Sequence, residues 1–103
     1  PQNPPDKLVS RDLSEGSGPG VKKGDEILVH YLGVDRDGEE VFSSYKYGRP
    51  LDYTIGSGAS SRGWEEGLEG MRAGGRRELW IPKRLAQGRQ QPLFYVVDLL
   101  EIQ

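Results

Sequence analysis

The chain has 103 residues, 14 of them basic and 16 acidic, which is enough for one domain around one core and gives a formal net charge of -2 at pH 7. This balance provides no positive field for nucleic acid or for an anionic membrane. The lack of cysteine excludes disulfides, thiolate chemistry and cysteine-ligated metals.

The N-terminal residues carry no strand or helix pattern. Residues 1–6 include three prolines and are expected to be a loose extension of a single domain over residues 1–103. The chain begins at Pro1 rather than at a methionine, so we expect that a native segment before it is missing. The compartment therefore stays open between the cytoplasm and export. The sequence shows no secretory signal and no membrane span.

Glycine makes up 15 of the 103 residues, about twice the usual share of roughly 7%, and indicates tight turns between short elements. Residues 26–33 alternate in polarity, which predicts a strand with Ile27, Val29 and Tyr31 on one face. A two-residue turn at Asp37-Gly38 then reverses the chain into a second strand.

Three further strands are predicted by the same alternation. Residues 51–55 alternate before the irregular segment 56–61. Residues 76–81 alternate and stop at Pro82, which cannot donate to a strand ladder. Residues 93–100 are apolar on both faces, so this strand is expected at the centre of the sheet or under cover.

One short helix is predicted over residues 62–71, between glycine-rich segments. Trp64, Leu68 and Met71 fall at i, i+4 and i+7 and so share one apolar face. Ser61 is a suitable N-cap. Glycines beside the helix let other backbone approach the indole, which suggests that Trp64 is the floor of a binding site.

The usual nucleophilic and metal-based sites have little support. His30 is the only histidine and lies on the strand face opposite Tyr31, so an exposed strand histidine is favoured over a Ser-His-Asp relay or a histidine-rich metal site. Glu65, Glu66 and Glu69 could form a carboxylate cluster, but they fit the solvated side of the helix better. We therefore predict no metal and no cofactor, and any enzymatic chemistry must need no nucleophile.

A set of short motifs extends from about Gly20 to the C-terminus. They are Val29-His30-Tyr31-x-Gly33, Asp37-Gly38-x-x-x-Phe42-x-Ser44, Ile55-Gly56, Arg62-Gly63-Trp64-Glu65-Glu66-Gly67, Met71-x-x-Gly74, Ile81-Pro82, Leu85-Ala86-x-Gly88 and Val97-x-Leu99-Leu100. Their order and spacing resemble the FKBP-type peptidyl-prolyl cis-trans isomerases, and no single motif carries the resemblance.

The resemblance implies an α+β fold, in which a twisted five- to six-stranded antiparallel β-sheet wraps around one short α-helix. A proline-accepting pocket would lie between the sheet and the helix. Its floor would be Trp64, and its walls would be Tyr31, Phe42 and Tyr95. Prolyl isomerisation breaks no covalent bond, so a pocket that binds the twisted amide and removes water from it needs no nucleophile.

The resemblance also implies a set of substrate-binding positions around the pocket. The Ser61 backbone N–H would bond a substrate carbonyl, and Ser60, Leu51, Gln87 and Ser43 would contribute as well. Several of these depart from the family pattern: Ser43 stands in place of an aspartate, Gln87 in place of a hydrogen-bonding tyrosine, and Leu51 in place of an aromatic residue. Ser60-Ser61 replaces a valine-isoleucine pair.

The loop over residues 83–92 differs from the family in length. It is about half as long as is usual, so we expect the cleft to be more open on that side. Loss of well-placed polar contacts commonly costs about 2 to 4 kcal/mol each in transition-state stabilisation. We therefore expect catalytic activity below that typical of the family.

Two functions remain open. The first is a peptidyl-prolyl isomerase (rotamase) of reduced activity that assists protein folding. The alternative is a catalytically impaired module that binds proline-containing or extended peptides in the same cleft. Expected partners are proline-containing peptides, unfolded protein clients and, more weakly, macrolide ligands of the FKBP type. No nucleic-acid partner is expected, and the chain is expected to be a monomer.

Overall fold

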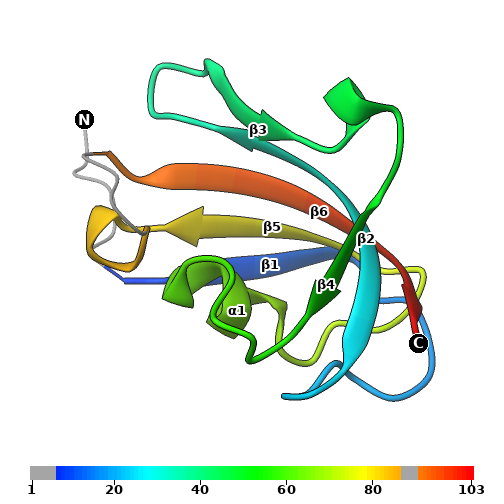
Figure 1. Cartoon of the computed structure of the whole chain (residues 1–103). Helices are drawn as coiled ribbons and strands as arrows, with labels where there is room; N and C mark the ends of the chain where they lie inside the picture. The colour runs from blue at the N-terminus through cyan, green and yellow to red at the C-terminus, as the bar shows by residue number, and fades with distance from the viewer. Residues whose placement is uncertain (1–6, 87–90) are drawn as a thin grey trace.

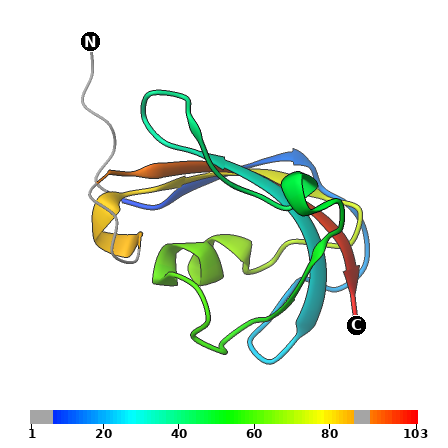
Figure 2. The same cartoon turned by 45° about the horizontal axis from the view of Figure 1, so that its top comes forward.

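A curved antiparallel sheet with one helix against its concave side makes up the fold (Figures 1 and 2). The structure, a computed structural model, describes residues 7–86 and 91–103. Its elements are β1 (Val9–Ser14), β2 (Glu26–Val34), β3 (Glu40–Ser43), the 3₁₀ turn η1 (Tyr45–Tyr47), β4 (Leu51–Thr54), α1 (Arg62–Leu68), β5 (Arg76–Ile81), the 3₁₀ turn η2 (Lys83–Leu85) and β6 (Leu93–Ile102).

The sheet has six strands in the order β1-β5-β6-β2-β3, with β4 also paired to β2. β3 and β4 pair with different parts of β2, since Leu32 lies opposite Ser43 and Ile27 lies opposite Tyr53. β6 is central, between β5 and β2, as its two apolar faces predicted. The expected α+β fold is thus confirmed, with six strands rather than five.

One strand was not predicted. β1 pairs with β5 at the edge of the sheet, and all six of its residues are exposed. Such a strand buries no face and therefore has no alternation for a sequence pattern to reveal. Its position is fixed instead by the ladder to β5 and by Asp12, which pairs with Arg77.

The helix α1 is shorter than predicted, because it ends at Leu68 rather than at residue 71. Gly70 has φ of 81°, a left-handed conformation that terminates the helix. Met71 is nevertheless buried in the core, so the apolar face was correctly identified although the element ends earlier. Ser61 caps the helix as expected, since its Oγ accepts a hydrogen bond from the Trp64 backbone N–H at 3.3 Å.

Glycines in α1 allow it to pack closely on the sheet. A Cβ added at Gly67 would lie 2.8 Å from both Leu79 methyl carbons, and one at Gly63 would overlap Ile81. Because the helix backbone lies directly on β5, the Trp64 side chain is held at a fixed depth above the sheet.

The C-terminal end of α1 is held by Arg77 of β5. Its Nη1 donates to the backbone carbonyls of Gly67 and Glu69, each at 2.8 Å, and its Nε donates to Asp12 at 2.6 Å. These carbonyls would otherwise lack partners at the helix end. One nearly buried guanidinium therefore joins β1, β5 and α1.

The face of the sheet that carries α1 is called the inner face below, and the opposite face the outer face. The core fills the inner face, and its largest fully buried side chains include Ile27, Val29, Leu79, Val97 and Leu99. No helix in the described part of the chain is long and apolar enough to cross a membrane.

Candidate active site

A pocket of about 440 Å³ opens on the inner face of the sheet. It contains all four residues predicted to be catalytic, together with Ser60, Ser61 and Leu51 of the predicted substrate-binding set. Its lining is Tyr31, Phe42, Leu51, Asp52, Tyr53, Ala59, Ser60, Ser61, Trp64, Leu93 and Tyr95. Residues from β2, β3, β4, α1 and β6 therefore converge on one site.

The floor of the pocket is an indole surrounded by aromatic edges. Trp64 is only 3% exposed. Its ring meets Tyr31, Tyr95 and Tyr53 edge-on, with centroid distances of 5.3, 5.0 and 6.3 Å and interplanar angles between 61° and 81°. Edge-to-face contacts of this kind are favourable and hold each ring in one orientation. The arrangement leaves an apolar, rigid surface suited to a saturated ring such as that of proline.

Phe42 and Tyr95 form one wall of the pocket. Their rings are nearly parallel, with centroids 6.4 Å apart. Tyr95 is buried, whereas Phe42 is 42% exposed, so this wall runs from the pocket interior to solvent. A ligand can therefore reach the floor from the β3 side.

Gly33 leaves room for the Tyr95 ring. A Cβ at this position would lie 2.5 Å from Tyr95 Cε1 and 3.0 Å from Cζ, while the backbone of Gly33 has no positive φ. We expect Gly33→Ala to lower the free energy of unfolding by about 1 to 3 kcal/mol through overpacking. Adding Tyr95→Leu should recover part of this loss, because leucine has no atoms at the ring positions Cε1 and Cζ. Urea unfolding of the two variants and the single Tyr95→Leu control measures this coupling; additive losses would contradict it.

The segment 56–61 is held in place by Glu65. Its carboxylate accepts hydrogen bonds from the backbone N–H groups of Gly56 and Gly58, which have φ values of 90° and 76°. The sequence placed Glu65 on the solvated side of the helix, and that interpretation was incomplete. By fixing this segment, Glu65 positions Ser60 and Ser61 at the edge of the pocket.

Two tyrosine hydroxyls of the pocket remain protonated well above neutral pH. Burial raises the pKa of Tyr31, and nearby Tyr47 raises it further. Burial also raises the pKa of Tyr53, an effect that Ser57 opposes. The Tyr53 hydroxyl and the Trp64 Nε1–H are buried without a hydrogen bond of normal geometry among the described residues. The pocket thus offers neutral aromatic groups, and Asp52 is the acidic residue in its described lining.

Ser43 and Gln87 have different outcomes from the rest of the predicted set. Ser43 is buried, but it lies opposite Leu32, and antiparallel partners project to the same face. Leu32 alternates with Tyr31, so Ser43 belongs to the outer face and does not line the pocket. Gln87 lies outside the described residues.

Four lining residues were not singled out from the sequence: Asp52, Tyr53, Ala59 and Leu93. Alternation did place Tyr53 and Leu93 on apolar strand faces, but it could not separate pocket walls from core.

His30 also differs from expectation. Instead of standing exposed, it is half-buried, stacks on Tyr45 with centroids 4.5 Å apart, and lies 2.8 Å through Nδ1 from Ser44 Oγ. Among residues 7–86 and 91–103, no three histidine or acidic side chains gather as metal ligands would.

Comparison with known proteins identifies the family to which the chain belongs. Residues 18–99 match the profile of the family described as FKBP-type peptidyl-prolyl cis-trans isomerase. The chain belongs to this FKBP family. Membership confirms the resemblance inferred from the motifs and supports peptidyl-prolyl isomerase function in general.

Individual FKBP relatives cover nearly the whole chain. An FK506-binding protein of Streptomyces anulatus is 39% identical over 96% of this chain and 89% of its own length. One from Neisseria meningitidis serogroup B is 43% identical over 92% of this chain and 95% of its own. The crystal structure of AtFKBP13 aligns with a TM-score of 0.85 at 30% identity, covering 93% of each chain. That of FkpA from Escherichia coli aligns with a TM-score of 0.84 at 33% identity, covering 93% of this chain and 48% of the other.

Proposed function

We propose that this chain accelerates the cis-trans isomerisation of X-Pro peptide bonds, with an activity below that typical of its family, and thereby assists protein folding. The observation that carries the proposal is the closed set of aromatic edges around Trp64, beside the backbone of Ser60 and Ser61. The domain that does this is proposed to span the whole chain, because its described residues share one core.

The reaction that such a pocket would catalyse is rotation about the C–N bond of one peptide unit. The barrier to that rotation in a peptide is roughly 18 to 20 kcal/mol, because resonance gives the C–N bond partial double-bond character. Resonance weakens as the amide twists, and the carbonyl oxygen is then hydrated less strongly. An apolar pocket that fits the twisted form better than either planar form lowers the barrier. Neutral tyrosines and backbone N–H groups are sufficient for this.

Reduced activity is supported by one difference in the wall of the pocket. The family's aspartate after Phe42 is replaced by Ser43, but Ser43 faces away from the pocket, so this difference removes no contact with the substrate. Leu51 stands at the edge where an aromatic side chain would add a wall. An aromatic contact that is lost at this position costs about 0.5 to 1.5 kcal/mol. The aromatic floor and walls are present, so we propose weakened rather than absent catalysis.

The second candidate function is peptide binding without useful turnover. It is favoured by the same difference at Leu51 and by the exposure of Phe42, which extends the apolar wall of the pocket toward solvent. Proline-containing peptides and unfolded clients are the partners in both cases. The relatives carry the name FK506-binding protein, and we propose that macrolides of that type enter this pocket with lowered affinity.

Exchange spectroscopy of a capped proline peptide separates the two functions. We expect a substoichiometric amount of the protein to raise the cis-trans exchange rate measured by NMR. A matched peptide with glycine in place of proline should show no binding to the pocket. Peptide resonances that shift on titration while the exchange rate stays at its uncatalysed value would establish the binding module instead. If neither the shifts nor the rate change, both functions are wrong.

A further inference from the structure

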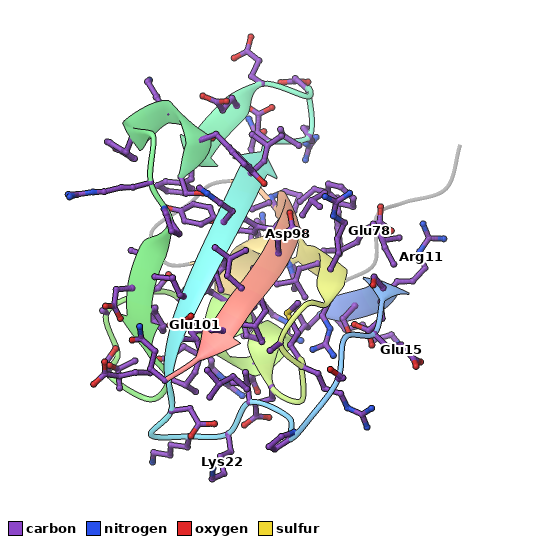
Figure 3. The ribbon with its side chains drawn as sticks, turned by 90° about the vertical axis from the view of Figure 1, so that its right-hand side faces the viewer. Arg11, Glu15, Lys22, Glu78, Asp98 and Glu101 are labelled. Atoms are coloured by element: carbon purple, nitrogen blue, oxygen red, sulfur yellow. The ribbon has the colours of Figure 1, made fainter. Side chains whose placement is uncertain are left out.

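The edge of β4 that faces away from β2 forms part of the pocket wall. Among the described strands, β4 pairs with β2 alone, and Figure 3 shows it on the side of β2 away from β6, which carries the labelled Asp98 and Glu101. Three successive β4 residues, Leu51, Asp52 and Tyr53, line the pocket. Successive side chains of a strand point to opposite faces, so the pocket must also border the backbone of this strand.

Asp52 contributes its backbone to the pocket, because its side chain projects to the other face of the sheet. It lies opposite Leu28, whereas Tyr53 lies opposite Ile27. Ile27 is fully buried on the inner face, so Leu28 and Asp52, one position out of phase, belong to the outer face. The pocket on the inner face therefore meets Asp52 at its peptide groups and not at its carboxylate.

The ladder between β2 and β4 fixes the direction of these peptide groups. The Ile55 N–H donates to the Asp25 carbonyl, and the Ile55 carbonyl accepts from the Gly24 N–H, each at 2.9 Å, so both Ile55 groups face β2. Backbone groups alternate in direction along an antiparallel strand, so those of Tyr53 also face β2 and those of Asp52 face away. No further backbone hydrogen bond to Asp52 is found among residues 7–86 and 91–103.

The N–H and the carbonyl of Asp52 are thus an unpaired donor and an unpaired acceptor in the wall of an aromatic pocket. Unpaired groups at a strand edge are a template for a further strand. Several peptide-binding domains use such an edge, where main-chain hydrogen bonds supply affinity for an extended peptide.

Antiparallel pairing with Asp52 suits a peptide residue that is adjacent to proline. The residue directly opposite Asp52 would exchange two hydrogen bonds with it and project its side chain to the outer face. The next residue of the peptide would project to the inner face, where the pocket is, and its backbone nitrogen would point away from β4. Proline meets both conditions, because its apolar ring fits the pocket and its nitrogen has no hydrogen to donate.

The residue after proline fits the position opposite Asp52 better than the residue before it. The carbonyl of the preceding residue belongs to the amide that rotates, and a hydrogen bond to that oxygen would favour the planar, resonance-stabilised form. The peptide unit after proline is not part of the rotating bond. Pairing on that side therefore holds the peptide without opposing the twist.

We propose that the free edge of β4 binds the residue after proline as a short antiparallel strand, through the backbone N–H and carbonyl of Asp52. This inference rests on the proposed function, since it places the peptide by the proline in the pocket. The two hydrogen bonds are the same in the planar and the twisted states of the substrate. They should therefore strengthen binding and leave the isomerisation rate within the complex unchanged.

Three capped peptides test the pairing on the wild-type protein. The first, acetyl-Ala-Pro-dimethylamide, has no N–H after proline. The second is acetyl-Ala-Pro-Ala-methylamide, and the third is its ester analogue, in which oxygen replaces the N–H of the residue after proline. NMR titrations give each dissociation constant, and exchange spectroscopy gives the rate at saturation. We expect the second peptide to bind about five-fold more tightly than the other two, the usual worth of one hydrogen bond, at similar exchange rates.

Proline substitutions within β4 separate Asp52 from the rest of the strand. Asp52→Pro removes the N–H at the free edge, where a strand tolerates proline, and should lower the advantage of the second peptide over the first to about two-fold or less. Thr54 faces the same edge, and its carbonyl accepts from Ser57 at 3.2 Å, but it does not line the pocket. Thr54→Pro is therefore the matched control and should keep the full advantage.

A side-chain variant separates the backbone of Asp52 from its carboxylate. Asp52→Ala should keep the advantage of the second peptide, because the pairing uses backbone groups alone. Loss of the advantage in Asp52→Ala would overturn the proposal and assign the effect to the carboxylate. Circular dichroism shows whether each variant is folded. If Asp52→Pro does not fold, the second and third peptides on the wild type decide the question.

The outcomes distinguish the edge of β4 from the function on which it rests. Equal affinities for the three peptides, or equal advantages in Asp52→Pro and Thr54→Pro, overturn the pairing, while acceleration of exchange by the wild type still upholds catalysis. Tighter binding of the second peptide without acceleration supports the pairing and overturns catalysis. If none of the three peptides binds, the pairing and the proposed function are both wrong.

Discussion

Replacing Trp64 by leucine is expected to remove most of the acceleration of prolyl exchange, whereas replacing Trp80 by leucine should leave it intact. The chain has two tryptophans, and they lie on opposite faces of the sheet. Trp64 is the floor of the pocket on the inner face. Trp80 pairs with Phe94 and Val9 across the strands, one position out of phase with buried Ile81, and so belongs to the outer face. The pair therefore gives matched substitutions with opposite functional predictions.

The expected loss follows from two contributions. Leucine offers no flat π-face, which removes an aromatic contact of about 0.5 to 1.5 kcal/mol. Leucine also covers less of the proline ring, and each Å² of apolar surface that stays in water forfeits about 25 cal/mol of binding free energy. Since about 1.4 kcal/mol corresponds to a factor of ten in rate, we expect the acceleration to fall at least about ten-fold.

Stability must be measured beside activity, because Trp64 contacts three other rings. Truncation of a buried tryptophan to alanine typically costs about 3 to 5 kcal/mol, and leucine should cost less. Domains of this size have about 5 to 15 kcal/mol of stability, so the leucine variant should remain folded at room temperature. Circular dichroism would verify this. A folded Trp64→Leu protein with wild-type exchange would refute the assignment of Trp64 as the floor.

The sequence predicted those parts of the fold that bury one regular face. The alternation in β2 placed Ile27, Val29 and Tyr31 together, and all three lie on the inner face. The spacing of Trp64 and Leu68 predicted α1, and both are buried. Burial of a periodic set of apolar residues is a local property of the chain, so a single sequence can reveal it.

Other features depend on contacts that no period encodes. β1 exposes all its residues, and the carboxylate of Glu65 turns back to segment 56–61 rather than to solvent. The outward direction of Ser43 depends on the register of β3 against Leu32. The aromatic site was therefore predictable through family resemblance, whereas its rim required the structure.

The neighbouring arginines of β5 provide the largest stability contrast. Arg77→Met is expected to lower the free energy of unfolding by about 2 to 4 kcal/mol, because the carbonyls of Gly67 and Glu69 lose a buried donor. Arg76→Met should cause a clearly smaller loss. Both arginines make short ion pairs, at 2.6 Å to Asp12 and 2.7 Å to Asp98, but their side chains are 11% and 52% exposed. Solvent screens the second pair, so its geometry contributes little to folding.

Urea unfolding followed by tryptophan fluorescence measures both variants under the same conditions. A shift of the midpoint at constant slope reports stability alone. Arg77→Lys should fall between wild type and Arg77→Met, because an ammonium keeps the charge but lacks the guanidinium fork that reaches the helix end and Asp12 together. Equal losses in Arg76→Met and Arg77→Met would mean that the ion pairs, and not the two carbonyls, carry the effect. Because Arg77 acts at the C-terminal end of α1 and Trp64 lies near its start, folded Arg77→Met should keep more of its exchange activity than Trp64→Leu.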